Sequence, residues 1–391
     1  MNHVKQIPAI LLLMLIAGCS TTHTLDLRVP EQGYEQATVD GEAKSPNAEP
    51  LRFWAGEPST FLYSDLTKST PLTVQGDALN ILVLSGGGAN GAFGTGIVNG
   101  LYEQNKLDQY SIVTGVSAGA LIAPFAFLGG DEIPRLKQVM LGVNDKDIIG
   151  KRNFLNTLFK DSFSKGDNMI DFIAEVYSQE MIEQIAKQHQ AGRRLFIGTT
   201  QFDSGRLSIW NIGEIANSDM DNKVKFIQQL IAASSSIPGV FPPQFIKVDY
   251  QGEEYEELHV DGGLSAQMFF EPVSTDYEKV SKILGLEKQP YIHVIRNGMF
   301  HMPYEATPDK GMALLTRSIK SLTVLQSRGD LYKMLYDSER QQIDLSFTYI
   351  SNDFDAPKGT KDMFDAEYMQ ALYNYGYNKA VNDQVWSKQL P

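Results

Sequence analysis

The feature that most constrains the fold is an apolar run followed by a glycine-rich turn and an apolar helical segment, which occurs twice in succession. The first unit joins Leu79–Ser85 to Gly86–Gly91, and the second joins Ser111–Thr114 to Gly115–Gly119. A short apolar run closed by glycines indicates a buried strand. Successive strand–loop–helix units favour parallel pairing of their strands. We therefore predict an α/β fold with a mainly parallel central sheet flanked by helices.

The rest of the chain supplies further predicted elements. A helix is expected from about Val224 to before Pro238, and the last hundred residues are expected to be mostly helical. Because no linker separates Leu79 from Trp386, residues 77–391 are predicted to form one domain with a helical C-terminal extension. Further strands are predicted at Leu195–Thr200 and Arg206–Trp210 around a hairpin-like turn, at Leu258–Asp261, at Tyr291–Arg296 and at Asp344–Ile350.

The N-terminus has the pattern of an export signal. Lys5 precedes the apolar run Ile7–Ile16, which is too short to span a bilayer comfortably. The following stretch through Ala17, Gly18 and Cys19 resembles the lipobox of bacterial lipoproteins. That resemblance implies removal of residues 1–18 as a signal peptide and attachment of lipid to Cys19, which would anchor the protein to a membrane.

Residues 19–76 are predicted to be the lipidated N-terminus and either a tether or an extended arm packed on the domain. Cys19 is the only cysteine, so disulfides, cysteine zinc sites and a cysteine nucleophile are not expected. Ser20 follows it, and in lipoproteins this residue implies the outer membrane of the bacterial cell envelope. A formal charge of −13 argues against nucleic acid as a partner but not against membranes.

The second glycine turn places a serine in the pattern Gly115-Xaa-Ser117-Xaa-Gly119 between a strand and a helix. Such a sharp turn pushes the serine hydroxyl out of the sheet, and the flanking glycines avoid clashes with the strand and the helix. The helix that starts near Ala118 directs backbone N–H groups at developing negative charge. Ser117 is therefore the candidate nucleophile.

The first glycine turn is a candidate oxyanion hole, because consecutive glycines let backbone N–H groups approach a ligand oxygen. Gly86, Gly87, Gly88 and Gly91 are its candidate residues, together with Ala118. The spacing also satisfies the dinucleotide fingerprint G-x-G-x-x-G. That alternative requires an acidic residue at the end of the second strand, and the strand instead ends without one.

A third glycine motif, Asp261-Gly262-Gly263, ends a predicted strand and makes Asp261 the candidate general base. A Ser–His–Asp triad is the alternative, with His293 or His301 in addition to Ser117 and Asp261. Among the other histidines, His259 is predicted to be a neighbour of Asp261 rather than a base. His189 follows a charged helical stretch and is predicted to lie on the surface.

Together these motifs resemble the patatin-like phospholipase family. The stretch Ala233–Pro243 is also similar to the family's segment between the serine and the aspartate, and the resemblance runs from about Leu79 into the C-terminal region. It implies a three-layer α/β/α fold and a Ser117–Asp261 dyad acting on acyl lipids, without histidine, metal or cofactor. One departure is Asn90, where the family often carries Arg or Lys.

The resemblance implies a lipid acyl hydrolase of the phospholipase A or lysophospholipase type. Ser117 attacks the ester, Asp261 accepts its proton, and N–H groups of the glycine loop hold the oxyanion. The expected partners are an acyl lipid or phospholipid substrate and the membrane. A non-catalytic lipid-binding lipoprotein is the alternative from another class, and an acyltransferase would share the same dyad.

Overall fold

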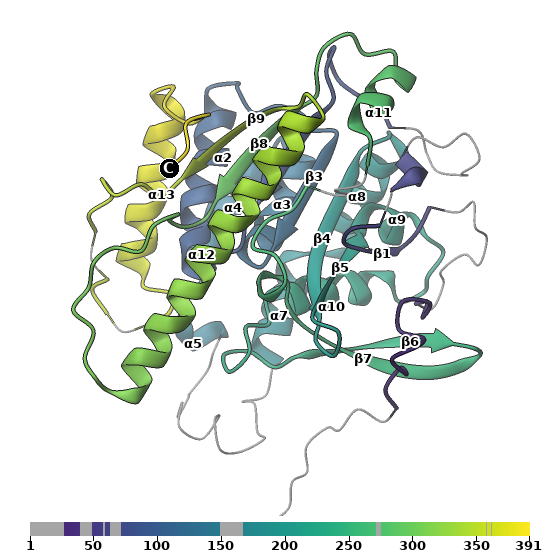
Figure 1. The fold of residues 1–391 in the computed structure, drawn as a ribbon, viewed down its shortest axis with the longest axis horizontal. Helices are drawn as coiled ribbons and strands as arrows, with labels where there is room; N and C mark the ends of the chain where they lie inside the picture. The colour runs from purple at the N-terminus through teal and green to yellow at the C-terminus, as the bar shows by residue number, and fades with distance from the viewer. Residues whose placement is uncertain are drawn as a thin grey trace, which may run out of the picture.

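The computed structural model describes residues 27–39, 49–57, 59–62, 72–148, 167–270, 275–356, 358–360 and 362–391. Its strands form one nine-stranded sheet in the order β1-β5-β4-β3-β2-β8-β9, to which β7 is attached through β4 and β6 through β7 (Figure 1). The strands are β1 (Arg52–Trp54), β2 (Asn80–Leu84), β3 (Ile112–Val116), β4 (Arg194–Gln201), β5 (Arg206–Asn211), β6 (Gln244–Tyr250), β7 (Glu253–Asp261), β8 (Tyr291–Arg296) and β9 (Asp344–Tyr349).

The centre of the sheet is parallel, as the two strand–loop–helix units predict. Strand β2 pairs in parallel with β3 and with β8, β3 with β4, and β8 with β9. Beyond β4 the sheet becomes antiparallel, because β4 and β5 form the predicted hairpin and β1 adds to β5. The hairpin of β6 and β7 is also antiparallel, and its first strand is absent from the sequence prediction.

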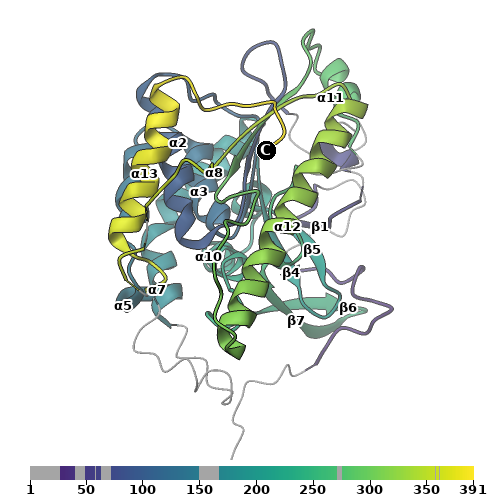
Figure 2. The ribbon, with the colours of Figure 1, turned by 60° about the vertical axis from the view of Figure 1, so that its left-hand side comes forward.

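Helices cover both faces of the sheet, which gives the three-layer α/β/α architecture. Figure 2 shows α2, α3, α8 and α13 on one side and α11 and α12 on the other. The helices are α2 (Gly91–Glu103), α3 (Ala118–Leu128), α4 (Glu132–Gly142), α5 (Asp145–Ile148), α7 (Asp167–Val176), α8 (Gln179–Gln190), α9 (Ile212–Asn217), α10 (Lys223–Ser234), α11 (Tyr277–Ile283), α12 (Gly311–Arg340) and α13 (Ala366–Val381).

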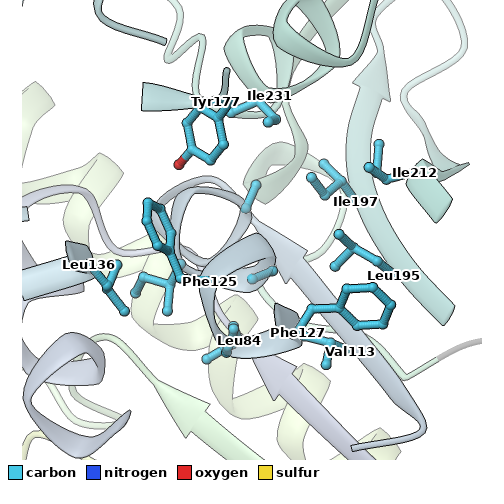
Figure 3. Close-up of a cluster of buried hydrophobic side chains, with 14 of the residues drawn as sticks. Leu84, Val113, Phe125, Phe127, Leu136, Tyr177, Leu195, Ile197, Ile212 and Ile231 are labelled. Carbon is cyan, nitrogen blue, oxygen red and sulfur yellow. The ribbon is translucent and has the colours of Figure 1, made fainter. Parts of the chain in front are cut away.

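The alternation of side chains along each strand supplies both interfaces. In β2, Leu82 and Leu84 belong to one buried cluster, whereas Ile81 and Val83 belong to another. This is the two-residue period of a strand that is covered on both faces. Figure 3 shows part of the first cluster, in which Leu84 lies among apolar side chains of β3, α3, α4 and β4.

The N-terminal part of the described chain lies on the domain. Strand β1 pairs with β5, with Arg52 opposite Trp210, so these residues extend the sheet as an arm. Residues 1–26, with the predicted signal and Cys19, lie outside the described residues. Within the part of the chain that is described, no helix combines the length and the apolar character needed to cross a bilayer.

Candidate active site

The predicted nucleophile lies on a sharp turn between β3 and α3. Ser117 has a φ of 53° and a ψ of −122°, a conformation that L-residues rarely adopt. The turn depends on the glycines on either side. A Cβ atom on Gly115 would lie 2.5 Å from the Gly119 carbonyl oxygen, and one on Gly119 would lie 2.1 Å from the Leu84 carbonyl oxygen. The steric reason for the Gly-Xaa-Ser-Xaa-Gly pattern therefore holds in this chain.

Strand β4 brings the serine and the aspartate together. Its residue Gly198 pairs with Val116, the last residue of β3, while the next residue, Thr199, pairs with Asp261, the last residue of β7. Strand β3 therefore pairs with the first part of β4, and β7 pairs with the part of β4 that follows. The two candidate residues lie at the same edge because both strands end against the same neighbour.

The two side chains form a direct hydrogen bond. The Ser117 hydroxyl donates to Oδ2 of Asp261 at 2.6 Å, and the Gly263 N–H donates to Oδ1 at 2.7 Å. Ser117 and Asp261 are 6% and 4% exposed. Burial raises the pKa of Asp261 to about 6, while the hydrogen bonds from Ser117 and Gly263 act in the opposite direction. The carboxylate is therefore a stronger base than an exposed aspartate.

The first glycine turn lies beside this pair. The Gly86 N–H donates to the Gln267 carbonyl oxygen at 2.9 Å, and the Gly91 N–H bonds within the loop, so neither is available to a ligand. By contrast, the N–H groups of Gly87, Gly88 and Ala118 have no acceptor among the described residues. Of the predicted oxyanion residues, these three retain a free donor.

Arg296 and Asn297, which the sequence prediction missed, hold the glycine loop by hydrogen bonds to its backbone. Arg296 donates from Nη1 to the Gly86 carbonyl oxygen at 2.7 Å, and burial lowers its pKa to about 10. The Asn297 amide donates to the Ser85 carbonyl oxygen at 2.8 Å, and its oxygen accepts from the Gly94 N–H at 3.0 Å. The guanidinium of Arg296 thus contacts the loop in which Asn90 stands.

Asn297 also explains one of the glycines. A Cβ atom on Gly87 would lie 2.1 Å from the Asn297 carbonyl oxygen, so this position has no room for a side chain. A polar pair at the end of a buried strand is the only sequence signal that could have indicated Arg296 and Asn297. That signal is weak, because such residues commonly end strands.

Ser234, at the end of α10, holds the backbone of the nucleophile. Its hydroxyl donates to the Gly198 carbonyl oxygen at 2.7 Å and accepts from the Ser117 N–H at 3.0 Å. The residue belongs to the Ala233–Pro243 stretch, whose resemblance to the family indicated no role for any single side chain. The structure gives Ser234 the role of fixing the turn at Ser117.

His259, predicted to be a neighbour of Asp261, and His293, a candidate for the triad, both have other partners. Nδ1 of His259 lies 2.9 Å from the Thr199 hydroxyl, and its Nε2 lies 3.0 Å from the Glu257 carboxylate. His293 lies 2.8 Å from the Tyr110 hydroxyl, and burial lowers its pKa to about 4. His301 instead lines the cavity that contains Ser117. In the described chain, no histidine hydrogen-bonds to Ser117 or Asp261.

The prediction that His189 lies on the surface is wrong. Its side chain is fully buried, and Nε2 lies 2.8 Å from a carboxylate oxygen of Glu214 and 3.8 Å from Glu49. The charged residues around His189 lie on the exposed face of α8, whereas His189 lies on the face that packs on α9. This group is the one set of described residues whose spacing could suit a metal ion. Arg194, 2.7 Å from Glu49, already supplies a positive charge there, so we interpret it as an ion-pair cluster.

Ser117 lies where two cavities meet. A small apolar pocket of about 50 Å³ extends from Ser117 between α3, α4 and α7, with Leu121, Met140 and Phe172 in its wall. A larger groove of about 750 Å³ contains both Ser117 and Asp261 and is lined on its outer side by α12. An apolar pocket and an open groove on either side of one hydroxyl suit a substrate with an apolar part and a polar part.

These features define the class of site. A strained serine follows a parallel strand, bonds to a buried carboxylate and lies beside free backbone N–H groups, as the nucleophile of a serine hydrolase does. Residues 82–273 match the family model of the patatin-like phospholipases, so this part of the chain is a patatin-like phospholipase domain. Lipid hydrolysis is the class of activity that this match supports. A comparison with curated proteins found no match.

Solved structures that are similar to this chain include two bacterial proteins. VipD from Legionella pneumophila is 14% identical, with a TM-score of 0.39, over 80% of this chain and 68% of that one. The type III effector ExoU of Pseudomonas aeruginosa is 15% identical, with a TM-score of 0.33, over 81% of this chain and 54% of that one. The chain therefore spans about half the length of ExoU.

Proposed function

We propose that the protein is a serine carboxylic-ester hydrolase of acyl lipids, in which Ser117 is the nucleophile and Asp261 the general base. The observation that carries the proposal is the 2.6 Å hydrogen bond from the Ser117 hydroxyl to the buried Asp261 carboxylate. A hydroxyl bonded to a base at this distance can transfer its proton as it attacks. No other side chain needs to move for that transfer.

The reaction proceeds in two halves. Ser117 Oγ attacks the carbonyl carbon of the ester, and its proton passes to Oδ2 of Asp261. The tetrahedral oxyanion accepts hydrogen bonds from the N–H groups of Gly87, Gly88 and Ala118. The C–O bond to the alcohol then breaks, and the alcohol leaves with the proton from Asp261. A water molecule next attacks the acyl-enzyme and gives a proton to Asp261. The bond between the acyl carbon and Ser117 Oγ then breaks, Asp261 returns the proton to Oγ, and the fatty acid leaves.

The environment of Asp261 suits this role. An aspartate with an ordinary pKa is a weak base toward a hydroxyl, whereas burial raises the pKa of Asp261 to about 6. The carboxylate remains ionised at neutral pH and is closer to the pKa that efficient proton transfer requires. Its second oxygen is held by the Gly263 N–H, so Oδ2 stays directed at the serine.

The two cavities support an acyl lipid as substrate. The apolar pocket beside Leu121 and Phe172 would accept the start of an acyl chain, and the groove would accept the alcohol portion of the ester. We also propose, from the lipobox resemblance, that lipid on Cys19 anchors the enzyme to the bacterial cell envelope, at the outer membrane. The enzyme would then act on lipids near its own anchor.

A fluorophosphonate probe and a defined phospholipid test the catalytic proposal. We expect the probe to label the parent chain, and Ser117→Ala to abolish both labelling and fatty-acid release. Asp261→Asn should lower the rate by about 10³-fold or more, because the base is lost while the shape is kept. Ser265→Ala is the matched control. It removes a hydroxyl near the site that bonds to Thr200 and should change neither readout greatly.

Other results would contradict the proposal. Full turnover by Asp261→Asn, combined with loss of turnover by His301→Ala, would show that His301 is the base. Stable lipid binding without release of fatty acid, unchanged in Ser117→Ala, would favour the non-catalytic lipoprotein. Transfer of the acyl group to an added alcohol in preference to water would identify an acyltransferase with the same dyad.

A further inference from the structure

The first half of α12 contributes no buried side chain. All the buried residues of this helix lie in its second half, from Ser327 to Ser338, and none of residues 311–326 is buried. Leu331 and Met334 join the buried cluster under this face of the sheet, so they hold the helix in place. The helix crosses the face of the sheet in Figure 1, and its first half extends toward the lower edge of the molecule in Figure 2.

This first half of α12, residues 311–326, is strongly apolar. Single exposed apolar residues are normal on a protein surface, but a contiguous group of them marks an interaction site. Here they recur on successive turns of one helix. Those that are exposed, with their exposed fractions, are Met312 (42%), Leu314 (49%), Leu315 (49%), Ile319 (57%), Leu322 (66%) and Leu325 (57%).

The first half of α12 carries a positive charge, opposite to that of the whole chain. The stretch from Lys310 to Arg328 contains four cationic side chains and no carboxylate, although the whole chain has a formal charge of −13. Arg317 donates to Glu305 at 3.0 Å and is compensated, whereas Lys320 faces the groove near Lys358. Among the described residues, Lys310 and Lys320 form no ion pair. An apolar helix with such lysines complements a surface that is apolar inside and anionic outside.

The same segment leads to the candidate nucleophile. Ile319, Lys320 and Leu322 line the groove of about 750 Å³ that also contains Ser117 and Asp261. A lipid leaving a surface held against this half of α12 would enter the groove without crossing bulk water. The position of the apolar segment thus connects the surface to the site.

We propose that residues 311–326 of α12 dock on an anionic phospholipid bilayer and hold the mouth of the groove against it. Ile319 and Leu322 enter the acyl boundary, while Lys310 and Lys320 lie at the phosphate level. Docking itself is independent of catalysis, but its role in delivering substrate rests on the proposed hydrolase function. The contact adds to any anchor at Cys19, because it orients the groove and not only the chain.

The experiment compares two isoleucines of similar exposure. Ile319 is 57% exposed on α12, and Ile283 is 51% exposed at the end of α11. Ile319→Glu, Leu322→Glu and Ile283→Glu are prepared in the full chain with Cys19→Ala, which removes lipidation. Any membrane affinity of residues 1–18 is common to all variants and cancels. The measurements are flotation with vesicles of phosphatidylcholine, with and without phosphatidylglycerol, and hydrolysis of vesicle lipid and of a soluble short-chain ester.

We expect Ile319→Glu and Leu322→Glu to lower flotation with the anionic vesicles and hydrolysis of vesicle lipid by about ten-fold or more, since each places a carboxylate where an apolar group met the acyl boundary. Ile283→Glu should behave as the parent. Ile283→Glu should also hydrolyse the soluble ester at the parental rate. Ile319→Glu and Leu322→Glu are judged on flotation, which requires no turnover, because both residues line the groove. Parental flotation should decrease at high salt and on vesicles without phosphatidylglycerol.

Equal flotation of Ile319→Glu and Ile283→Glu would overturn the proposal. A dimeric parent would also overturn it, if Ile319→Glu dissociated the dimer in light scattering and left flotation with vesicles unchanged. A second copy of the chain would then cover the helix. The two proposals fail separately. A parent that floats but hydrolyses neither substrate retains the docking surface and contradicts the hydrolase function.

Discussion

Asp261 is under two opposing influences. Its burial disfavours the charged form, while the Ser117 hydroxyl and the Gly263 N–H both stabilise that form by hydrogen bonds. Burial is the larger effect, so the pKa rises to about 6. At the scale of the residue, the same shift has one consequence for activity and another for stability, and the two can be measured separately.

The consequence for activity is a dependence on pH. Because only the ionised carboxylate accepts a proton, kcat/KM should increase about ten-fold per pH unit below about 6 and become constant above it. The measurement is the initial rate on a soluble ester between pH 4 and pH 9. His301→Ala should leave the midpoint unchanged. A midpoint that moves in this variant would assign the titration to the imidazole instead.

The consequence for stability has the opposite sign. An acid whose pKa is higher in the folded protein than in the unfolded chain costs stability as pH rises between the two values. Asp261→Asn removes that cost, and should raise the free energy of unfolding by about 1–3 kcal/mol at pH 8 and by almost nothing at pH 4. Urea unfolding at both pH values tests this. A variant destabilised at pH 8 would show that the carboxylate is better accommodated than its burial implies.

At the scale of elements, the site is an arrangement of turns that meet at the end of β4. Ser117 follows β3, Asp261 ends β7, and Gly86 follows β2, while Gln267 links these turns to α12. The Gln267 carbonyl oxygen accepts from Gly86, its amide donates to the Gly263 carbonyl oxygen at 2.7 Å, and its backbone N–H donates to Asp330 of α12 at 2.7 Å. Each turn is local, but their mutual placement depends on these links.

The elbow turn is expected to tolerate no side chain at Gly119. In Gly119→Ala the new Cβ atom would meet the Leu84 carbonyl oxygen at 2.1 Å, and backbone cannot yield as a side chain can. We expect a loss of about 3 kcal/mol or more in the free energy of unfolding, together with loss of activity. Gly142→Ala, at the end of α4 with no atom within 4 Å of the new Cβ, is the control for urea unfolding. Equal stability of the two variants would contradict the close approach of α3 to the end of β2.

Gln267 lines the groove beside Ser117 and is expected to position the site through its hydrogen bonds to the turns. Gln267→Leu removes the amide donor to Gly263 and leaves the Asp261 turn unsupported, so we expect kcat to fall about 10- to 100-fold. KM should change little. Gln228→Leu is the matched control, because the amide of Gln228, on α10, donates to the Tyr177 carbonyl oxygen away from the nucleophile. A parental kcat in Gln267→Leu would exclude a positioning role.

How much the sequence could predict differs between local and distant features. Periodicity and glycines were sufficient for the parallel strands, for the turn at Ser117 and for Asp261 at a strand end, because each is specified by neighbouring residues. The hairpin of β6 and β7 and the roles of Ser234, Gln267 and Asn297 were missed. Their contacts join segments far apart in the chain, and nothing in a local pattern specifies them.

At the scale of the whole molecule, the N-terminal arm is tied to the strand that carries Asp261. Arg52 of β1 forms a buried ion pair with Glu257 of β7 and also donates to the Ala37 carbonyl oxygen. Glu257 in turn contacts His259 at 3.0 Å. Burial tends to raise the pKa of Glu257, but the positive charge of Arg52 and the hydrogen bond with His259 hold it below its ordinary value. The arm therefore supplies the charge that β7 requires.

This dependence predicts an asymmetric double-mutant cycle. Arg52→Met leaves Glu257 buried without its cation, and we expect a loss of about 3–5 kcal/mol in the free energy of unfolding. Adding Glu257→Gln to that variant removes the uncompensated charge and should recover a large part of the loss. Urea unfolding of the parent, both single variants and the double variant measures the coupling. If Arg52→Met cost less than about 1 kcal/mol, the arm would not be part of the folded unit, and residues 49–57 would act only as a tether. If Arg52→Met lost both a large part of the free energy of unfolding and its turnover, the arm would help to hold Asp261 beside Ser117, because Glu257 and Asp261 lie on the same strand.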